Sequence, residues 1–329
     1  MKNQQSKIPI DSLFLVTGGA GFIGSNLCEA LLQKGYRVRC LDNLSTGSKK
    51  NIENFLPNPN YEFIEGDIRD FEMCKTSCQN VEYLLHEAAL ESVPQSFEMP
   101  LLYFENNVVG ISNLLEAAKQ CNVKKFIYAS SAAIYGDSEV LPQSEDLAEH
   151  CLSPYAATKL MGEKYAHQYS LNFRLDTYGL RYFNVFGRRQ NPYAENAAII
   201  PLFFKELLND ESPIIYGNGL QSRDFTYIDN IIDANLKACC APSEIAGEVF
   251  NIACGSQISL LEVYRLLSEL LGKNIPPKFE PVRLGDIKHS RADISKAMNL
   301  LGYVPKYNFV EGINLLANWY KDHLKELIE

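Results

Sequence analysis

Short apolar runs alternate with amphipathic stretches along the first half of the chain. Six of these runs have the length and the flanking turn residues of buried strands: 13–17, 37–41, 61–64, 81–86, 125–130 and 177–182. Between them, apolar residues recur at helical spacing, for example at Val108, Ile111 and Leu115. Strands that alternate with helices predict an α/β fold with a doubly wound parallel sheet and helices on both faces.

The pattern changes after Asn184, where glycine and proline become frequent. Helical spacing returns at residues 260–271 and 310–327. We therefore predict a first domain at residues 1–183 and a smaller α/β domain at 184–329. We expect residues 223–256 to pack back onto the first domain.

Composition excludes several classes of protein. The chain is 46% hydrophobic and 22% charged, which predicts a packed globule, and its net charge of −9 argues against a nucleic-acid partner. Nine cysteines without a CxxC motif indicate reduced thiols and a cytoplasmic protein. The five histidines show no metal-ligand spacing, so we expect no metal site. The polar N-terminus and the absence of a long apolar stretch predict neither a signal peptide nor a membrane partner.

Three glycines follow the first predicted strand in the spacing Gly18-x-x-Gly21-x-x-Gly24. Such glycines permit a tight turn and a close approach of the backbone to a pyrophosphate, and the helix that follows favours its negative charge. The second strand ends at Asp42, close to the spacing of a carboxylate that binds the adenosine ribose. Because a carboxylate would repel a 2′-phosphate, the sequence predicts NAD rather than NADP.

Tyr155 and Lys159 lie one helical turn apart, behind the helix-start signal Ser153-Pro154. The spacing alone establishes only a shared helix face. The position of the pair supports a catalytic role, because Ser131 ends the preceding strand at the sheet edge where open α/β folds bind ligands. A tyrosine base needs its pKa lowered by about 3, and a lysine ammonium and a cationic nicotinamide are suitable causes. The trio predicts removal of a proton from an alcohol.

These motifs together resemble the extended short-chain dehydrogenase/reductase family, in its nucleotide-sugar 4-epimerase branch. The likeness spans nearly the whole chain and rests on the segments 17–24, 86–89, 130–136, 155–159, 181–184 and 222–225. Segments 184–190, 197–201 and 289–293 are most similar to bacterial epimerases that act on UDP-N-acetylhexosamines. The resemblance implies a Rossmann-type domain that binds NAD and a C-terminal domain that binds a UDP-sugar.

The resemblance also implies roles for individual residues. Tyr155 would be the base at the sugar 4-hydroxyl, Lys159 would hold the nicotinamide ribose and Ser131 would bind the 4-oxygen. The expected dinucleotide contacts are Gly18, Gly21, Phe22, Ile23, Gly24, Asp42, Asn43, Ser45, Thr46, Gly47, Asp67, Ile68, Ala88, Ala89, Asn107, Tyr155, Lys159 and Tyr182. The expected substrate contacts are Glu91, Ser92, Ser130, Ser131, Tyr155, Asn184, Gln190, Ala198, Ile199, Tyr216, Arg223, Arg283, Asp286 and Ser290.

Ala132 and Ala133 discriminate between reaction classes. Dehydratases of this superfamily carry an acid pair there, and decarboxylating relatives keep a glutamate, whereas alanine cannot transfer a proton. Reversible 4-epimerisation of a UDP-hexose remains, with UDP-N-acetylglucosamine and UDP-N-acetylgalactosamine as the expected pair and UDP-glucose and UDP-galactose as a second pair. Three alternatives stay open: an epimerase of another nucleotide sugar such as a UDP-uronic acid, a reductase or dehydrogenase that exchanges its cofactor, and a non-enzymatic NAD-binding module.

Two further residues bear on the sugar. Glu91 stands where the acetylhexosamine epimerases usually have glycine, and a carboxylate that faces the ring would count against a uronic acid. Ser290 lies two residues before Ala292-Asp293, where family members with tyrosine accept only plain hexoses and members with smaller residues admit acetamido sugars. Finally, the helices expected at 102–121 and 154–172 resemble the pair that forms the family's dimer, so we expect a homodimer.

Overall fold

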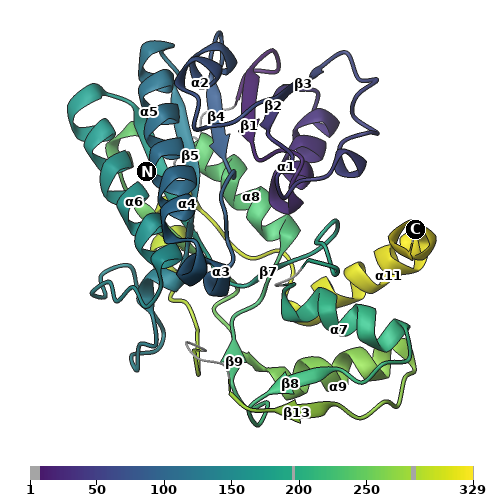
Figure 1. Cartoon of the computed structure of the whole chain (residues 1–329). Coiled ribbons are helices and arrows are strands. Elements are labelled where there is room, and N and C mark those ends of the chain that lie inside the picture. Colours follow the sequence, from purple (N-terminus) through teal and green to yellow (C-terminus); the bar gives the residue numbers. More distant parts are fainter. Residues whose placement is uncertain (1–7, 195–196, 283–286, 329) are drawn as a thin grey trace.

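A seven-stranded parallel sheet forms the centre of the computed structural model, which describes residues 8–194, 197–282 and 287–328 (Figure 1). The strand order is β11-β6-β5-β4-β1-β2-β3. This order confirms the predicted doubly wound parallel sheet. The strands are β1 (Leu13–Thr17), β2 (Arg37–Asp42), β3 (Tyr61–Glu65), β4 (Tyr83–His86), β5 (Lys125–Ser131), β6 (Asp176–Tyr182) and β11 (Val249–Ile252).

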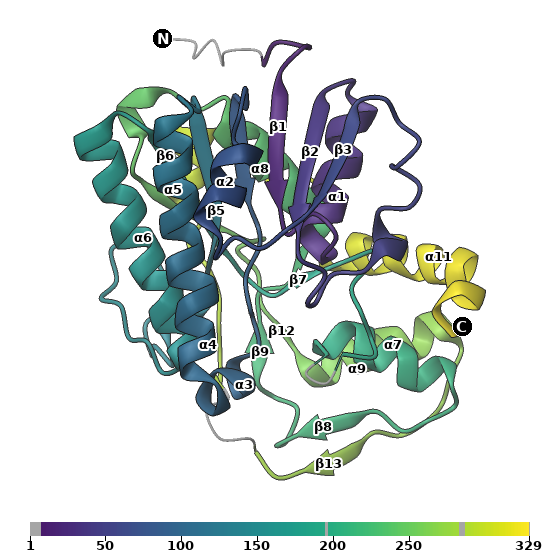
Figure 2. The ribbon, with the colours of Figure 1, turned by 45° about the horizontal axis from the view of Figure 1, so that its top comes forward.

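Helices cover both faces of this sheet. Figures 1 and 2 show α2, α5 and α6 on one face and α1 and α8 on the other. Alternate side chains of β1 feed the two resulting cores, since Phe14 and Val16 join one buried cluster and Leu13 and Leu15 join the other. The helices are α1 (Phe22–Gln33), α2 (Phe71–Ser77), α3 (Val93–Glu98), α4 (Pro100–Phe104), α5 (Gly110–Gln120), α6 (Pro154–Phe173) and α8 (Ile228–Cys239). Short turns of helix are η1 (Lys49–Asn51), the π-helix η2 (Glu105–Val109), η3 (Ala132–Tyr135) and η4 (Ser243–Ile245).

A smaller lobe lies beyond the carboxyl ends of the strands (Figure 2). The chain enters it after β6, returns to the sheet with α8 and β11, and ends in the lobe. Helix α9 begins at a capping box between Ser259 and Glu262 and ends at Gly272 in the left-handed conformation. The elements of this part are β7 (Val185–Phe186), α7 (Ile199–Leu208), β8 (Ile214–Tyr216), β9 (Ser222–Arg223), β10 (Thr226–Tyr227), β12 (Ile258–Ser259), α9 (Leu260–Leu271), β13 (Lys278–Glu280), α10 (Ser295–Leu301) and α11 (Phe309–Ile328).

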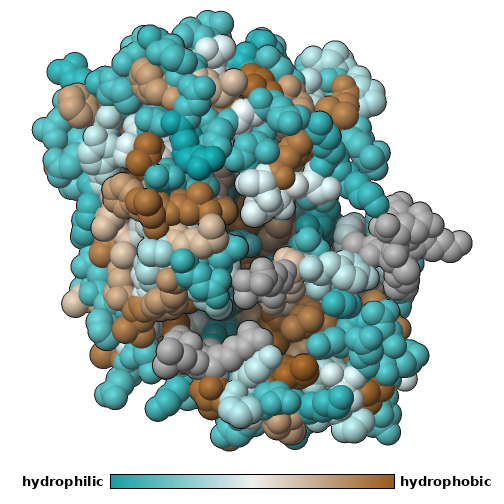
Figure 3. Space-filling model, viewed as in Figure 1, coloured by the Kyte–Doolittle hydropathy of each residue, from teal (hydrophilic) through white to brown (hydrophobic). Residues whose placement is uncertain are grey.

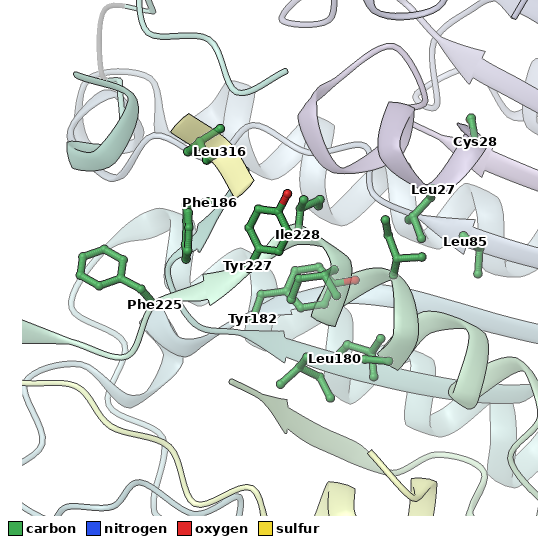
Figure 4. Close-up of a cluster of buried hydrophobic side chains, with 14 of the residues drawn as sticks. Leu27, Cys28, Leu85, Leu180, Tyr182, Phe186, Phe225, Tyr227, Ile228 and Leu316 are labelled. Atoms are coloured by element: carbon green, nitrogen blue, oxygen red, sulfur yellow. The ribbon is translucent and has the colours of Figure 1, made fainter. Parts of the chain in front are cut away.

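An aromatic cluster joins the lobe to the sheet (Figure 4). Phe186 is its centre, with ring centroids 5.5 Å from Tyr227 and from Phe309 and 6.5 Å from Phe225. Leu27 of α1 belongs to the same buried cluster. Large buried aromatic rings contribute strongly to packing, so this cluster holds the lobe against the carboxyl edge of the sheet. Within the described ranges, we find no helix that is both long and apolar enough to cross a membrane.

Candidate active site

The turn between β1 and α1 forms the first part of the site. Gly18 has a φ of 67°, and a Cβ atom there would lie 2.7 Å from the backbone nitrogen of Ala88, so only glycine fits. A Cβ atom at Gly24 would collide with the Gly18 carbonyl, because α1 lies directly against the turn. Helix α1 starts after Gly21 with Phe22 and Ile23, and neither these residues nor the cap offers an acid. Its first N–H groups therefore suit the pyrophosphate of a dinucleotide.

Asp42 ends β2 beside this turn and is buried. Its Oδ2 accepts a hydrogen bond from Ala20 N (2.9 Å) and its Oδ1 accepts one from Leu44 N (2.8 Å). Burial raises the pKa of this carboxyl, and the two N–H donors oppose that rise. Each carboxylate oxygen has a second lone pair, so Asp42 can still accept hydrogen bonds from ribose hydroxyls.

The other residues expected near the adenosine lie around Asp42. Asn43 accepts a hydrogen bond from Ser45 N and donates one to Asp67 Oδ2, at 3.0 and 2.9 Å. Arg69 pairs with Asp67 at 2.7 Å and is the main reason that the pKa of Asp67 falls to about 2. Gly47 borders Asp42, with the exposed Thr46 before it, and the buried Ile68 follows Asp67. The structure thus gathers Asn43, Ser45, Thr46, Gly47, Asp67 and Ile68 at one edge of the site.

Ser131, Tyr155 and Lys159 meet at the carboxyl ends of β5 and β6. Ser153 caps α6 by accepting a hydrogen bond from Ala156 N at 3.1 Å, which places Tyr155 in the first turn of the helix. The Ser131 side chain hydrogen-bonds the phenol of Tyr155. Lys159 Nζ donates to the Ala129 carbonyl at 3.0 Å and lies 5.9 Å from the centroid of the Tyr155 ring. The trio predicted from the sequence therefore shares one site.

The electrostatics of this trio differ from our expectation. We predicted that Lys159 lowers the pKa of Tyr155, but burial raises the phenol pKa above its usual range, and Ser131 is the neighbour that lowers it. Burial also lowers the pKa of Lys159 to about 8, although Glu87, Glu91 and Glu163 oppose that fall. The protein's own groups therefore keep the Tyr155 phenol protonated at neutral pH.

Ser130 does not face the substrate side as expected. It is 3% exposed, and its hydroxyl donates to Glu163, which forms a buried ion pair with Arg181 at 2.7 Å. Arg181 in turn donates to Tyr135 Oη at 2.8 Å. Successive strand residues point to opposite faces, so Ser130 joins this core network while Ser131 faces Tyr155. Only the backbone of Ser130 is left for a substrate.

Asn107 was expected to contact the dinucleotide, but its amide is committed to the protein. It lies in the π-helix η2, accepts a hydrogen bond from Leu90 N and donates to Leu90 O, both at 2.9 Å. It also donates to Thr158 Oγ1 at 3.1 Å. Asn107 therefore fixes the segment after β4, in which Ala88 and Ala89 line a small cavity beside Lys159.

Glu91 and Ser92 follow this fixed segment. The Glu91 side chain is solvent-exposed, yet protein around it raises its pKa, and the Lys159 charge opposes that rise. Its charge also raises the pKa of Tyr155. Ser92 caps α3 by accepting a hydrogen bond from Gln95 N at 3.3 Å. Of the two, Glu91 has the free polar atoms for a ligand.

Asn184 and Ser290 meet on the lobe side of the site. Asn184 Nδ2 donates to the Asp224 carbonyl at 3.0 Å and to Ser290 Oγ at 3.4 Å. Ser290 is 5% exposed, so little space surrounds its hydroxyl. The Asp224 carboxylate accepts hydrogen bonds from Cys254 N and Ala292 N, at 3.0 and 3.2 Å. Four distant chain segments therefore converge at the wall that contains Ser290.

The remaining substrate-side residues lie on separate elements of the lobe. Ala198 and Ile199 begin α7, and Tyr216 ends β8. Arg223 donates to the Ser222 and Lys288 carbonyls, and Gln190 donates to the Val185 carbonyl at 3.3 Å. Arg283 and Asp286 lie outside the described residues.

Comparison with known proteins agrees with this geometry. Residues 14–253 match the model of the NAD dependent epimerase/dehydratase family. The chain belongs to this family. It is 35% identical to the UDP-glucose 4-epimerase of Mycolicibacterium smegmatis, over 94% of this chain and 98% of that protein.

Two solved structures of this epimerase/dehydratase family are similar over nearly their whole length. A UDP-N-acetylglucosamine 4-epimerase from Methanobrevibacter ruminantium M1, in complex with UDP-N-acetylmuramic acid, is 38% identical with a TM-score of 0.90, over 95% of this chain and 99% of that chain. A UDP-glucuronic acid 4-epimerase from Bacillus cereus, in complex with UDP-glucuronic acid and NAD, is 36% identical with a TM-score of 0.87, over 94% and 99%. The predicted family, enzyme class and cofactor are confirmed.

Two residues of this epimerase/dehydratase site were missed from the sequence. Glu87 lies between the glycine turn and the trio, and Tyr182 donates to its Oε1 at 2.9 Å. Asp224 is fully buried, and burial raises its pKa to about 7. Both belong to motifs that we singled out, yet only contacts between distant segments reveal what their side chains do.

Proposed function

We propose that this chain is an NAD-dependent UDP-hexose 4-epimerase that interconverts UDP-N-acetylglucosamine and UDP-N-acetylgalactosamine. The observation that supports it best is the convergence of Ser131, Tyr155 and Lys159 behind the alanine pair Ala132-Ala133. This arrangement supplies a base for an alcohol but no acid that could expel a second substituent. The relatives act on UDP-glucose, UDP-N-acetylglucosamine and UDP-glucuronic acid. They share 4-epimerisation of a UDP-sugar but differ in the sugar, so they support the class of reaction more strongly than the choice of sugar.

In this proposal Tyr155 takes the proton of the 4-hydroxyl and later returns it to the 4-oxygen. Bound NAD would accept the hydride from C4 and give it back to the other face, and its charged nicotinamide would favour the phenolate. Ser131 hydrogen-bonds the phenol and so favours the phenolate form. Lys159, held by the Ala129 carbonyl, is placed for the nicotinamide ribose. The 4-keto sugar turns its other face within the site, so no net oxidation results.

The cofactor fits the groups present in the chain. The free start of α1 would bind the pyrophosphate, and Asp42 would accept hydrogen bonds from the adenosine ribose. Asn184 and Arg223 would hold the sugar diphosphate, with Tyr216 against the uracil. These assignments, like that of Arg283, rest on the family motifs that the residues match.

The choice of an acetamido sugar rests on Ser290 and Glu91. Ser290 is a small residue in a confined wall beside Asn184, so it leaves more room than a bulky residue would. Glu91 carries a negative charge toward the catalytic trio, and two carboxylates in one pocket repel each other. We therefore rank UDP-hexosamines first, UDP-hexoses second and UDP-uronic acids last.

A panel of UDP-sugars tests this function. The protein is incubated with UDP-N-acetylglucosamine, UDP-glucose and UDP-glucuronic acid, and NMR follows the appearance of each 4-epimer. We expect the acetamido sugar to turn over fastest without added NAD. Faster turnover of UDP-glucuronic acid would overturn the choice of sugar. Consumption of added NAD in step with product would instead identify a dehydrogenase.

We also propose that the protein is a homodimer through α4 and α6. Large apolar side chains are exposed on these helices, including Leu101 at 69% and Leu171 at 65%. Figure 3 shows hydrophobic surface over this side of the molecule. The two helices also contact each other. An exposed apolar face of this kind indicates a protein–protein interface.

A further inference from the structure

Glu87 carries a carboxyl group for which the proposed mechanism has no task. It follows β4, which lies between β1 and β5 in the sheet. Its N–H donates to the Thr17 carbonyl at 3.2 Å, and its backbone lies against Gly18. Because the glycine turn suits the pyrophosphate and Lys159 suits the nicotinamide ribose, Glu87 stands midway along the dinucleotide site.

The two carboxyl oxygens of Glu87 have different surroundings. Oε1 accepts the hydrogen bond from Tyr182 Oη at 2.9 Å, and Tyr182 Oη accepts one from Asn235 Nδ2 at 2.8 Å. Oε2 is buried and has no hydrogen-bond partner among the described residues. A buried polar atom without a partner destabilises the fold, and more so when it is charged. This oxygen therefore favours a proton, a ligand group, or both.

Burial of Glu87 favours the protonated form. Burial raises the pKa of Glu87 to about 8, while the Tyr182 hydroxyl and the Lys159 ammonium lower it without cancelling the rise. At neutral pH the group is therefore mostly a carboxylic acid. A carboxylate would repel a diphosphate, whereas an acid O–H donates a strong hydrogen bond to an anionic oxygen.

We propose that Glu87 is a neutral acid in the working protein and that its Oε2–H donates a hydrogen bond to the diphosphate–ribose part of the bound dinucleotide. Tyr182 and Asn235 are positioning residues that orient the carboxyl group. The proposal rests on the proposed NAD site. It gives the chain a cofactor contact that is lost when Glu87 ionises.

Retention of NAD(H) through gel filtration tests this proposal, at about pH 7 and about pH 9.5. Wild type should keep NAD(H) at the lower pH and lose it at the higher, since affinity falls by about tenfold per pH unit above the pKa of an obligatory acid. Glu87→Gln keeps a neutral donor of similar shape and should retain NAD(H) at both. Glu87→Leu has no donor and should bind at least about tenfold more weakly at both.

Tyr182→Phe tests whether ionisation of Glu87 controls retention. It removes the hydrogen bond that favours the charged form, so Glu87 should stay neutral to higher pH and the variant should outlast wild type at pH 9.5. Lys159 has a pKa of about 8 and is the competing cause. The Glu87 charge raises the pKa of Lys159, so Glu87→Gln should lower that pKa. If deprotonation of Lys159 caused the release of NAD(H), Glu87→Gln would therefore lose NAD(H) at a lower pH than wild type.

Loss of NAD(H) from Glu87→Gln at a lower pH than from wild type would overturn the proposal, as would equal retention by wild type and Glu87→Leu at about pH 7. Thermal unfolding of each variant at both pH values separates lost affinity from lost structure. UDP-sugar turnover is measured separately. A protein that loses NAD(H) as described but epimerises no sugar would reject the proposed function and keep the role of Glu87.

Discussion

Single residues set the chemistry at the carboxyl edge of the sheet. Burial opposes ionisation of Tyr155, and the Ser131 hydroxyl favours it through one hydrogen bond. Replacing the phenol by a phenyl ring removes the proposed base and leaves the shape of the buried side chain nearly unchanged.

Tyr155→Phe should therefore lower kcat by about a hundredfold or more while NAD content and thermal stability stay near wild type. NMR of epimer formation measures the rate, and NAD(H) per protomer measures the cofactor. Ser131→Ala should cost less, because it removes a neighbour of the base and keeps the base itself. A loss below about tenfold for Tyr155→Phe is only about 1.4 kcal/mol and would exclude it as the main base.

In our proposal, Ser290 determines whether the sugar pocket admits an acetamido group at C2. A tyrosine in its confined position overpacks the wall beside Asn184 at a cost of about 1–3 kcal/mol. Ser290→Tyr should reduce turnover of UDP-N-acetylglucosamine by roughly ten- to a hundredfold and preserve that of UDP-glucose better. Ser290→Ala is the control and should keep the preference. Equal losses on both sugars would show that Ser290 does not line the pocket at C2.

The π-helix η2 places Asn107 against the segment that follows β4. Its extra backbone residue per turn projects Asn107 toward Leu90, where one amide satisfies both the N–H and the carbonyl of that residue. Asn107 therefore holds the middle of the segment from Glu87 to Ser92, between the cofactor and sugar sides of the site.

Asn107→Ala should lower the free energy of unfolding by about 1–3 kcal/mol, because two backbone groups of Leu90 lose their partner. Urea unfolding with an unchanged m value measures this loss. Asn314→Ala is the matched control, since the Asn314 amide donates one exposed hydrogen bond to Val310 O within α11. If the two variants were equally stable, the anchoring role of Asn107 would be wrong.

The secondary-structure elements also show which parts of the fold could be predicted from the sequence. The predicted strand at residues 125–130 corresponds to β5, and the predicted helix at 154–172 to α6, because a short apolar run and the Ser153-Pro154 cap are local signals. The short helix α3 was not predicted, since six residues carry too little periodicity. The predicted helix at 102–121 corresponds to the end of α4, η2 and α5.

Within the site, motifs locate residues but do not orient side chains. Both Ser130 and Ser131 were expected at the substrate, yet neighbouring strand residues face opposite ways and only the packing of Glu163 and Arg181 decides which one turns inward. The contact from Glu87 to Tyr182 spans 95 positions and leaves no local trace in the sequence.

For the whole molecule, the exposed apolar face on α4 and α6 predicts the oligomeric state. Leu101→Glu combined with Leu171→Glu places charges in the proposed interface, and burying unpaired charge is costly. We expect wild type to behave as a dimer by light scattering and the double variant as a monomer. Val310→Glu is the control, because Val310 is similarly exposed on α11, away from this face. A monomeric wild type would contradict the proposal.

The place of β11 at the edge of the sheet has a consequence for synthesis on the ribosome. β6 ends at Tyr182, but its outer neighbour β11 starts only at Val249, after much of the lobe has been made. At about 5–20 residues per second, the open edge of β6 waits roughly 3–13 seconds for its partner. During that interval the nascent chain presents an unpaired strand edge, which is the feature that neighbouring chains on a polysome can join.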